Sequence, residues 1–89
     1  MTEDKFFVYI LRSLRQSDKV YVGFTTNIQR RLDEHNAGTQ TYFHRYAPWK
    51  LITYVVFHDR TTALAFEQYL KSPSGKAFAV KHLLPPVQN

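Results

Sequence analysis

The sequence contains no cysteine, which excludes disulfides and the thiolate chemistry of zinc fingers, redox motifs and cysteine nucleophiles. A reducing cytoplasm fits this composition, and we expect the protein there. No apolar run approaches the roughly 20 residues that span a bilayer, and the start, MTEDKFF, lacks the pattern of a signal peptide. Repeats and linkers are also missing from the 89 residues. The sequence therefore predicts a single domain over residues 1–89, with no membrane partner.

Aromatic residues and positive charge are what the sequence has in quantity. Hydrophobic residues make up 44% of the chain and aromatic residues 16%, which predicts a folded globule with one modest core. The formal net charge is +5 and the pI is 9.7. A positive field concentrates polyanions, so nucleic acid is the leading class of partner. Because mild basicity also serves solubility alone, the positions of the charges must decide.

Strand and helix patterns alternate along the chain in the order ββαβαα, which predicts an α+β fold. The expected elements are strands over residues 5–13, 20–25 and 50–58 and helices over 28–37, 60–72 and 76–84. The first two strands form a hairpin, and the first helix begins after Thr26 or Asn27 and ends before Gly38. The third strand is apolar on both faces, which favours the centre of the sheet. Residues 39–49 have no clear period and are expected to form a surface loop.

The first two helices each place charge on the stripe that faces the core. Helical spacing puts Arg31 and His35 on the apolar stripe of the first helix, and Glu67 on that of the second. An unpaired buried charge costs several kcal/mol, so these groups must be paired, solvated in a cleft or used chemically. One interpretation is a structural ion pair between Arg31 and Glu67 at the rim of the core.

Two tyrosines and a glycine change this balance. Strand alternation places Tyr9 on one face of the first strand, and Tyr21 and Gly23 together on one face of the second. If these faces coincide, two hydroxyls lie side by side, and a glycine within a strand often marks close approach by a ligand or another backbone. Hydroxyls, a guanidinium, an imidazole and a carboxylate gathered on one patch suit phosphodiester hydrolysis. A tyrosine acting as general base needs nearby cations to lower its pKa from about 10.

The same residues carry a resemblance to a known superfamily. From about Phe6 to Leu83 the chain resembles the GIY-YIG nucleases, through the triplets Val8-Tyr9-Ile10 and Tyr21-Val22-Gly23 followed by Arg31, His35 and Glu67. The ending YLKSPSGKAFAVKHL is similar to a bacterial subgroup of small single-domain members. The resemblance implies a three-stranded antiparallel sheet flanked by helices. It also implies a metal-dependent endonuclease that hydrolyses DNA phosphodiester bonds, in DNA repair or recombination.

The resemblance implies a role for each matching side chain. Glu67 binds one divalent cation, Mg²⁺ or Mn²⁺. Tyr9 is the general base or positions the attacking water, assisted by Tyr21. Arg31 holds the scissile phosphate, and His35 shares in proton transfer or phosphate contact. Two features depart from the family pattern: Val8 stands in place of glycine, and the only asparagine after the glutamate helix is Asn89.

Five further positions are candidates for contact with nucleic acid. They are Gly23, His44, Arg45, Lys71 and Lys76. A solvated loop explains His44 and Arg45 equally well, a solvated charge explains Lys71, and a capped helix start explains the stretch that contains Lys76.

Two alternatives to an enzyme stay open at this point. The first is a nucleic-acid-binding module on the same fold with little or no catalysis. The second is an interaction protein whose inward charges form a structural network. The sequence also leaves open a homodimer or a targeting partner, and the form of the nucleic acid substrate.

Overall fold

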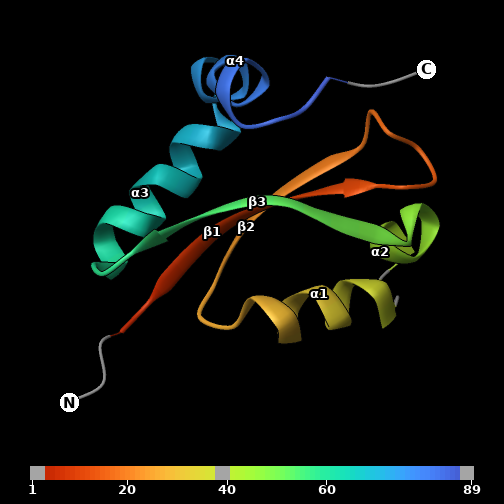
Figure 1. Ribbon diagram of the computed structural model, residues 1–89, viewed down its shortest axis with the longest axis horizontal. Coiled ribbons are helices and arrows are strands. Elements are labelled where there is room, and N and C mark those ends of the chain that lie inside the picture. The colour runs from red at the N-terminus through yellow and green to blue at the C-terminus, as the bar shows by residue number, and fades with distance from the viewer. Residues whose placement is uncertain (1–3, 38–40, 87–89) are drawn as a thin grey trace.

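The computed structural model describes residues 4–37 and 41–86 of the chain (Figure 1). Its elements are, in chain order, β1 (Phe6–Ser13), β2 (Val20–Thr25), α1 (Ile28–Ala37), α2 (Thr41–Tyr46), β3 (Trp49–Phe57), α3 (Arg60–Lys71) and α4 (Pro73–His82). The strands form an antiparallel sheet in the order β2-β1-β3. The predicted α+β fold and the order ββαβαα are confirmed, with α2 as an additional short helix. Gly38 and Asn89 lie outside the described residues.

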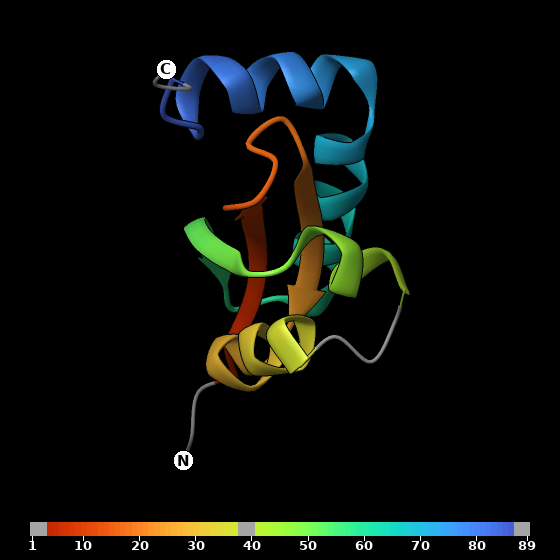
Figure 2. The same ribbon diagram turned by 90° about the vertical axis from the view of Figure 1, so that its right-hand side faces the viewer.

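Helices cover both faces of this sheet, and β1 runs through the middle of the resulting sandwich. Helices α3 and α4 lie on one face, and α1 and α2 lie on the other (Figures 1 and 2). Alternation along β1 sends Val8 and Ile10 into the core under α3 and α4, and Tyr9 and Leu11 into the core under α1 and α2. The strand that carries Tyr9 is therefore held from both sides by apolar packing.

The expectation that the third strand lies at the centre of the sheet is wrong, because β1 occupies that place. The apolar character of β3 on both faces has a different cause. Phe57 at one end packs against Phe66 of α3, while Trp49 and Leu51 at the other end join the core under α1 and α2. An edge strand that contributes to two cores has the same composition as a central strand.

The segment predicted as a surface loop contains the helix α2. Six residues form a helix that is too short to be stable by itself, so tertiary contacts must hold it. The indole of Trp49 donates a hydrogen bond to the carbonyl of Phe43, at 3.1 Å, and the rings of Tyr42 and Phe43 pack around that indole. These aromatic contacts have no period in the sequence, which is why the helix escaped prediction.

The helix boundaries follow from side-chain caps. Asn27 accepts a hydrogen bond from the backbone N–H of Arg30 at the start of α1, and Asp59 accepts one from Thr62 at the start of α3. Helix α4 begins at Pro73, three positions earlier than expected, because Ser72 caps it and proline suits a first helical turn. Among the residues described, no helix is both long and apolar enough to cross a membrane.

Candidate functional site

The register of the hairpin brings the two tyrosines onto one face. Tyr9 of β1 lies opposite Gly23 of β2, and the neighbouring pair on that face is Leu11 with Tyr21. The rings of Tyr9 and Tyr21 have centroids 6.2 Å apart. The predicted juxtaposition of the two tyrosines is therefore confirmed.

Gly23 makes this arrangement possible by having no side chain. A Cβ atom at this position would lie 2.5 Å from Cζ of Tyr9 and 2.9 Å from Cε1 of Tyr21, closer than nonbonded carbon atoms approach. The close approach that the glycine marks is thus that of the Tyr9 ring, and Gly23 itself is buried. Its predicted contact with nucleic acid gives way to a packing role inside the site.

The hydroxyl of Tyr9 is paired with His35 of α1. The phenol oxygen lies 3.1 Å from Nε2 of His35, and both side chains are buried. Burial raises the pKa of Tyr9 well above its usual value, with the neighbouring Tyr21 adding to the effect and Arg31 opposing it. Burial also lowers the pKa of His35, and the charge of Arg31 lowers it further. The expected lowering of the Tyr9 pKa by cations is wrong for the protein alone, because burial outweighs Arg31.

Both members of this pair are neutral near pH 7. With its own proton on Nδ1, the imidazole of His35 accepts the hydroxyl proton of Tyr9 at Nε2. The pair is thus a donor and an acceptor without net charge, which a buried position tolerates.

Arg31 lies at the open side of this pair, one helical turn before His35. Its side chain is 41% exposed, and one terminal nitrogen lies 3.5 Å from the carboxylate of Glu34. The Nε atom is buried and has no hydrogen-bond partner. Since an unpaired buried donor is costly, this N–H is free to bind an oxygen atom that a ligand brings.

Glu67 approaches the same region from α3. Its side chain is 13% exposed, and Oε2 accepts a hydrogen bond of 3.1 Å from Nζ of Lys71, four residues later on the helix. The charge of Glu67 contributes to the raised pKa of Tyr9, which places the carboxylate within electrostatic range of the hydroxyl. Arg31 and Glu67 thus have separate salt-bridge partners, and the structural ion pair between them does not form.

The donor set at Glu67 fits a magnesium-type site. Within residues 4–37 and 41–86, no three His, Cys, Asp or Glu side chains gather in a way that could hold a metal ion. Zinc sites need at least three protein ligands, whereas Mg²⁺ keeps several waters and binds through one or two carboxylates together with substrate phosphates. A single carboxylate beside a phosphate-binding surface therefore suits Mg²⁺ or Mn²⁺.

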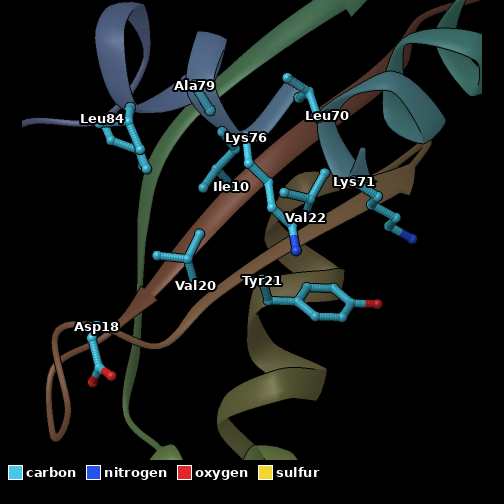
Figure 3. A pocket seen from close by; sticks show the side chains of 11 residues that line it. Ile10, Asp18, Val20, Tyr21, Val22, Leu70, Lys71, Lys76, Ala79 and Leu84 are labelled. Atoms are coloured by element: carbon cyan, nitrogen blue, oxygen red, sulfur yellow. The ribbon is translucent and has the colours of Figure 1, made fainter. Parts of the chain in front are cut away.

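The remaining candidates lie around this centre. Lys71 is paired with Glu67, and Lys76 of α4 lines a groove that begins beside Tyr21 (Figure 3). His44 and Arg45 are exposed on α2 and line a separate hollow. The structure thus gathers the five predicted catalytic residues and leaves His44 and Arg45 apart from them.

Two residues of this region escaped the sequence analysis. Phe43 of α2 packs edge-on against His35 and Tyr21, with ring centroids 4.1 Å and 5.1 Å away, and so shields the pair of Tyr9 and His35. Its signal was the run of aromatic residues in the segment 41–46. Arg15 lines the hollow of His44 and Arg45 from the β1–β2 turn, and turn residues carry no periodic signal.

Comparison with known proteins places this geometry in a family. Residues 5–81 match the family profile described as the GIY-YIG catalytic domain. A UPF0213 protein of Streptococcus pyogenes serotype M3 is 35% identical over 72 residues, which cover 80% of this chain and 76% of that protein. A UPF0213 protein of Haloquadratum walsbyi is 37% identical over 70 residues, covering 78% of this chain and 76% of the relative.

A solved structure agrees with these matches. The solution NMR structure of the UPF0213 protein BH0048 from Bacillus halodurans is 28% identical, with a TM-score of 0.54, and the match covers 92% of this chain and 88% of that one. The family profile spans both triplets, the arginine and histidine of α1 and the glutamate of α3. The chain therefore belongs to the GIY-YIG family of nuclease-type catalytic domains, among its UPF0213 members.

Proposed function

We propose that this protein is a metal-dependent endonuclease that hydrolyses phosphodiester bonds in DNA, and that it acts in the cytoplasm as a single domain in DNA repair or recombination. The observation that carries the proposal is the hydrogen bond between Tyr9 and His35 beside the unpartnered Nε of Arg31. A proton acceptor and a free phosphate-binding donor at one place are what hydrolysis of a phosphodiester requires.

Tyr9 and His35 act as a proton relay in this proposal. The attacking water gives a proton to the phenol oxygen of Tyr9 while the hydroxyl proton of Tyr9 passes to Nε2 of His35. The resulting hydroxide forms the new bond to phosphorus, and the bond to the leaving oxygen breaks. Because the phenol gains one proton as it loses another, the relay works with the raised pKa that burial imposes.

Arg31 and Glu67 serve the phosphate in this proposal. The guanidinium of Arg31 binds phosphate oxygens and stabilises the charge that grows on them in the transition state. Glu67 would hold the divalent cation, Mg²⁺ or Mn²⁺, which neutralises charge on the leaving oxygen when bound. Tyr21 lies between the tyrosine–histidine pair and the groove, where it positions the water or the strand.

The proposal is tested by cleavage of labelled single-stranded, duplex and branched DNA in Mg²⁺, in Mn²⁺ and in EDTA. Wild type is compared with Glu67→Gln, and Asp33→Asn on the exposed side of α1 is the matched loss of one carboxylate charge. We expect metal-dependent cleavage that Glu67→Gln abolishes and Asp33→Asn retains. Intact DNA in every wild-type reaction, together with salt-sensitive binding, overturns the proposal in favour of a binding module without catalysis.

A further inference from the structure

A groove runs from the candidate active site along the sheet edge formed by β2. It has a volume of about 420 Å³ and lies between β2, the end of α3 and α4 (Figure 3). Its walls are mostly aliphatic, and they include Val20, Val22, Leu70, Ala79, Val80 and Leu84. The catalytic proposal uses none of these walls. The volume falls within the range of roughly 300–1,000 Å³ that is typical of sites for small organic groups.

Positive charge lies on the side of the groove that faces the candidate active site. Lys71 and Lys76 line it, and the amine of Lys76 extends over β2 toward Tyr21 (Figure 3). Lys71 is engaged with Glu67, whereas Lys76 takes part in neither of the two salt bridges found among the described residues. One carboxylate, that of Asp18, lies at the far end. A ligand that suits this groove therefore joins an apolar face to an anionic group near Lys76.

The groove is also continuous with the candidate active site. Tyr21 lines the groove while its ring packs against both Tyr9 and His35. Lys71 lines the groove while its amine binds Glu67. Figure 3 shows the hydroxyl of Tyr21 and the amine of Lys71 extending to the same side. A strand bound at Glu67 and Arg31 therefore passes the mouth of the groove.

We infer that the groove binds one unpaired nucleotide of the substrate strand next to the cleaved phosphate. The base packs against the aliphatic walls, and the phosphate of the same nucleotide binds Lys76. This inference rests on the proposed function and names the form of its substrate. Bases in a duplex are stacked and paired, so only a single-stranded or extruded base can turn its face into an apolar wall.

The test separates the base from the phosphate by the choice of probe. Three ligands are compared by fluorescence anisotropy in EDTA: a short single-stranded oligodeoxynucleotide, a fully abasic strand of the same length, and a blunt duplex. We expect wild type to bind the strand that carries bases about tenfold more tightly than the abasic strand, because each buried base contributes binding energy beyond the charge.

Val80 provides a variant that alters the groove without disturbing the core. This side chain is 68% exposed, so Val80→Glu leaves the packing of the fold intact while placing a charge on the wall. The matched control is Val56→Glu on β3, where an exposed valine of the opposite sheet face undergoes the same change. We expect Val80→Glu to remove the preference for bases and Val56→Glu to retain it.

The lysines supply a second pair of variants on one helix. Lys76→Gln should weaken both single strands by the same factor, since it removes a phosphate contact and leaves the apolar wall. Lys81→Gln removes the same charge from α4 outside the groove, and it should leave both affinities within about twofold of wild type.

Three results overturn the inference. They are equal binding of the base-bearing and abasic strands by wild type, equal effects of the two valine variants, and a wild-type dimer in sedimentation that Val80→Glu converts to monomer. The last result assigns the groove to a second copy of the chain. Because binding is measured without metal, a preference for bases in a protein that cleaves nothing supports the groove while the proposed nuclease activity fails.

Discussion

The hydroxyl of Tyr9 lies 3.1 Å from Nε2 of His35, although the two residues are 26 positions apart in the chain. The central strand β1 supplies one partner and α1 supplies the other. Burial raises the pKa of Tyr9 and lowers that of His35, so a proton can leave the phenol toward the imidazole only as the phenol gains another. The pair thus connects the packing of the core to the proposed chemistry.

Replacement of Tyr9 by phenylalanine tests this pair directly. Tyr9→Phe keeps the ring that packs beside Gly23 and removes only the hydroxyl, so the fold should persist. We expect the single-turnover rate of metal-dependent cleavage to fall at least about 100-fold, as expected for the loss of a general base. Circular dichroism and DNA affinity serve as controls, and both should stay near wild type.

A double variant shows whether the two residues act together. If Tyr9 and His35 form one relay, Tyr9→Phe combined with His35→Gln should lose little more activity than Tyr9→Phe alone. Independent roles predict losses that multiply, and that result would separate His35 from the relay.

A methyl group at position 23 should disturb both stability and activity. In Gly23→Ala the new atom falls 2.5 Å from Cζ of Tyr9 and 2.9 Å from Cε1 of Tyr21, so the rings must move. We expect a loss of about 1–3 kcal/mol in the free energy of unfolding, measured with urea, together with slower cleavage. Gly23→Ala in a Tyr9→Leu background should cost less than in wild type. An equal cost in both backgrounds places the strain elsewhere.

The parts of the fold that depend on period and capping could be predicted from the sequence. The hairpin face that joins Tyr9 to Tyr21 follows from alternation, and the start of α3 follows from Asp59 as a cap. The five catalytic candidates were named because charges on apolar stripes and the two triplets are patterns within single elements. Such patterns need no knowledge of how the elements pack.

The parts that depend on contacts between elements could not be predicted. The place of β3 at the sheet edge and the shielding position of Phe43 arise from packing that no local pattern records. The direction of the Tyr9 pKa was also missed, because it depends on how much burial outweighs the charge of Arg31. The partner of Glu67 is Lys71 on its own helix, a local alternative to the pair with Arg31.

The lowered pKa of His35 predicts a loss of stability in mild acid. The ordinary pKa of histidine is 6.5, and the folded value lies below it, so the unfolded chain binds a proton at a pH where the folded chain does not. The free energy of unfolding should therefore fall as the pH drops below 6.5 toward the folded pKa. Urea titrations across this range measure it. His35→Gln should flatten the dependence, and His44→Gln, at an exposed position, should leave it unchanged.

Arg31 and its neighbour Arg30 form a matched pair for testing phosphate binding. Arg31 carries the buried unpartnered Nε, whereas Arg30 is exposed on the next position of α1. We expect Arg31→Ala to slow cleavage about 100- to 1,000-fold by removing charge stabilisation in the transition state. Arg30→Ala removes the same charge and should change the rate by less than about threefold, within the range of nonspecific electrostatics. Comparable losses in the two variants contradict the assignment.

The hollow of Arg15, His44 and Arg45 should bind the DNA backbone away from the cleaved bond. These exposed groups line about 420 Å³ beside α2, and Phe43 of the same helix reaches the catalytic pair. Arg45→Gln should weaken DNA binding and reduce the slope of log affinity against log salt by about 1, while the cleavage rate at saturating protein stays the same. Lys81→Gln is the control for an equal loss of charge. If the slope does not change with Arg45→Gln, this residue is a solvated charge and the strand follows another path across the surface.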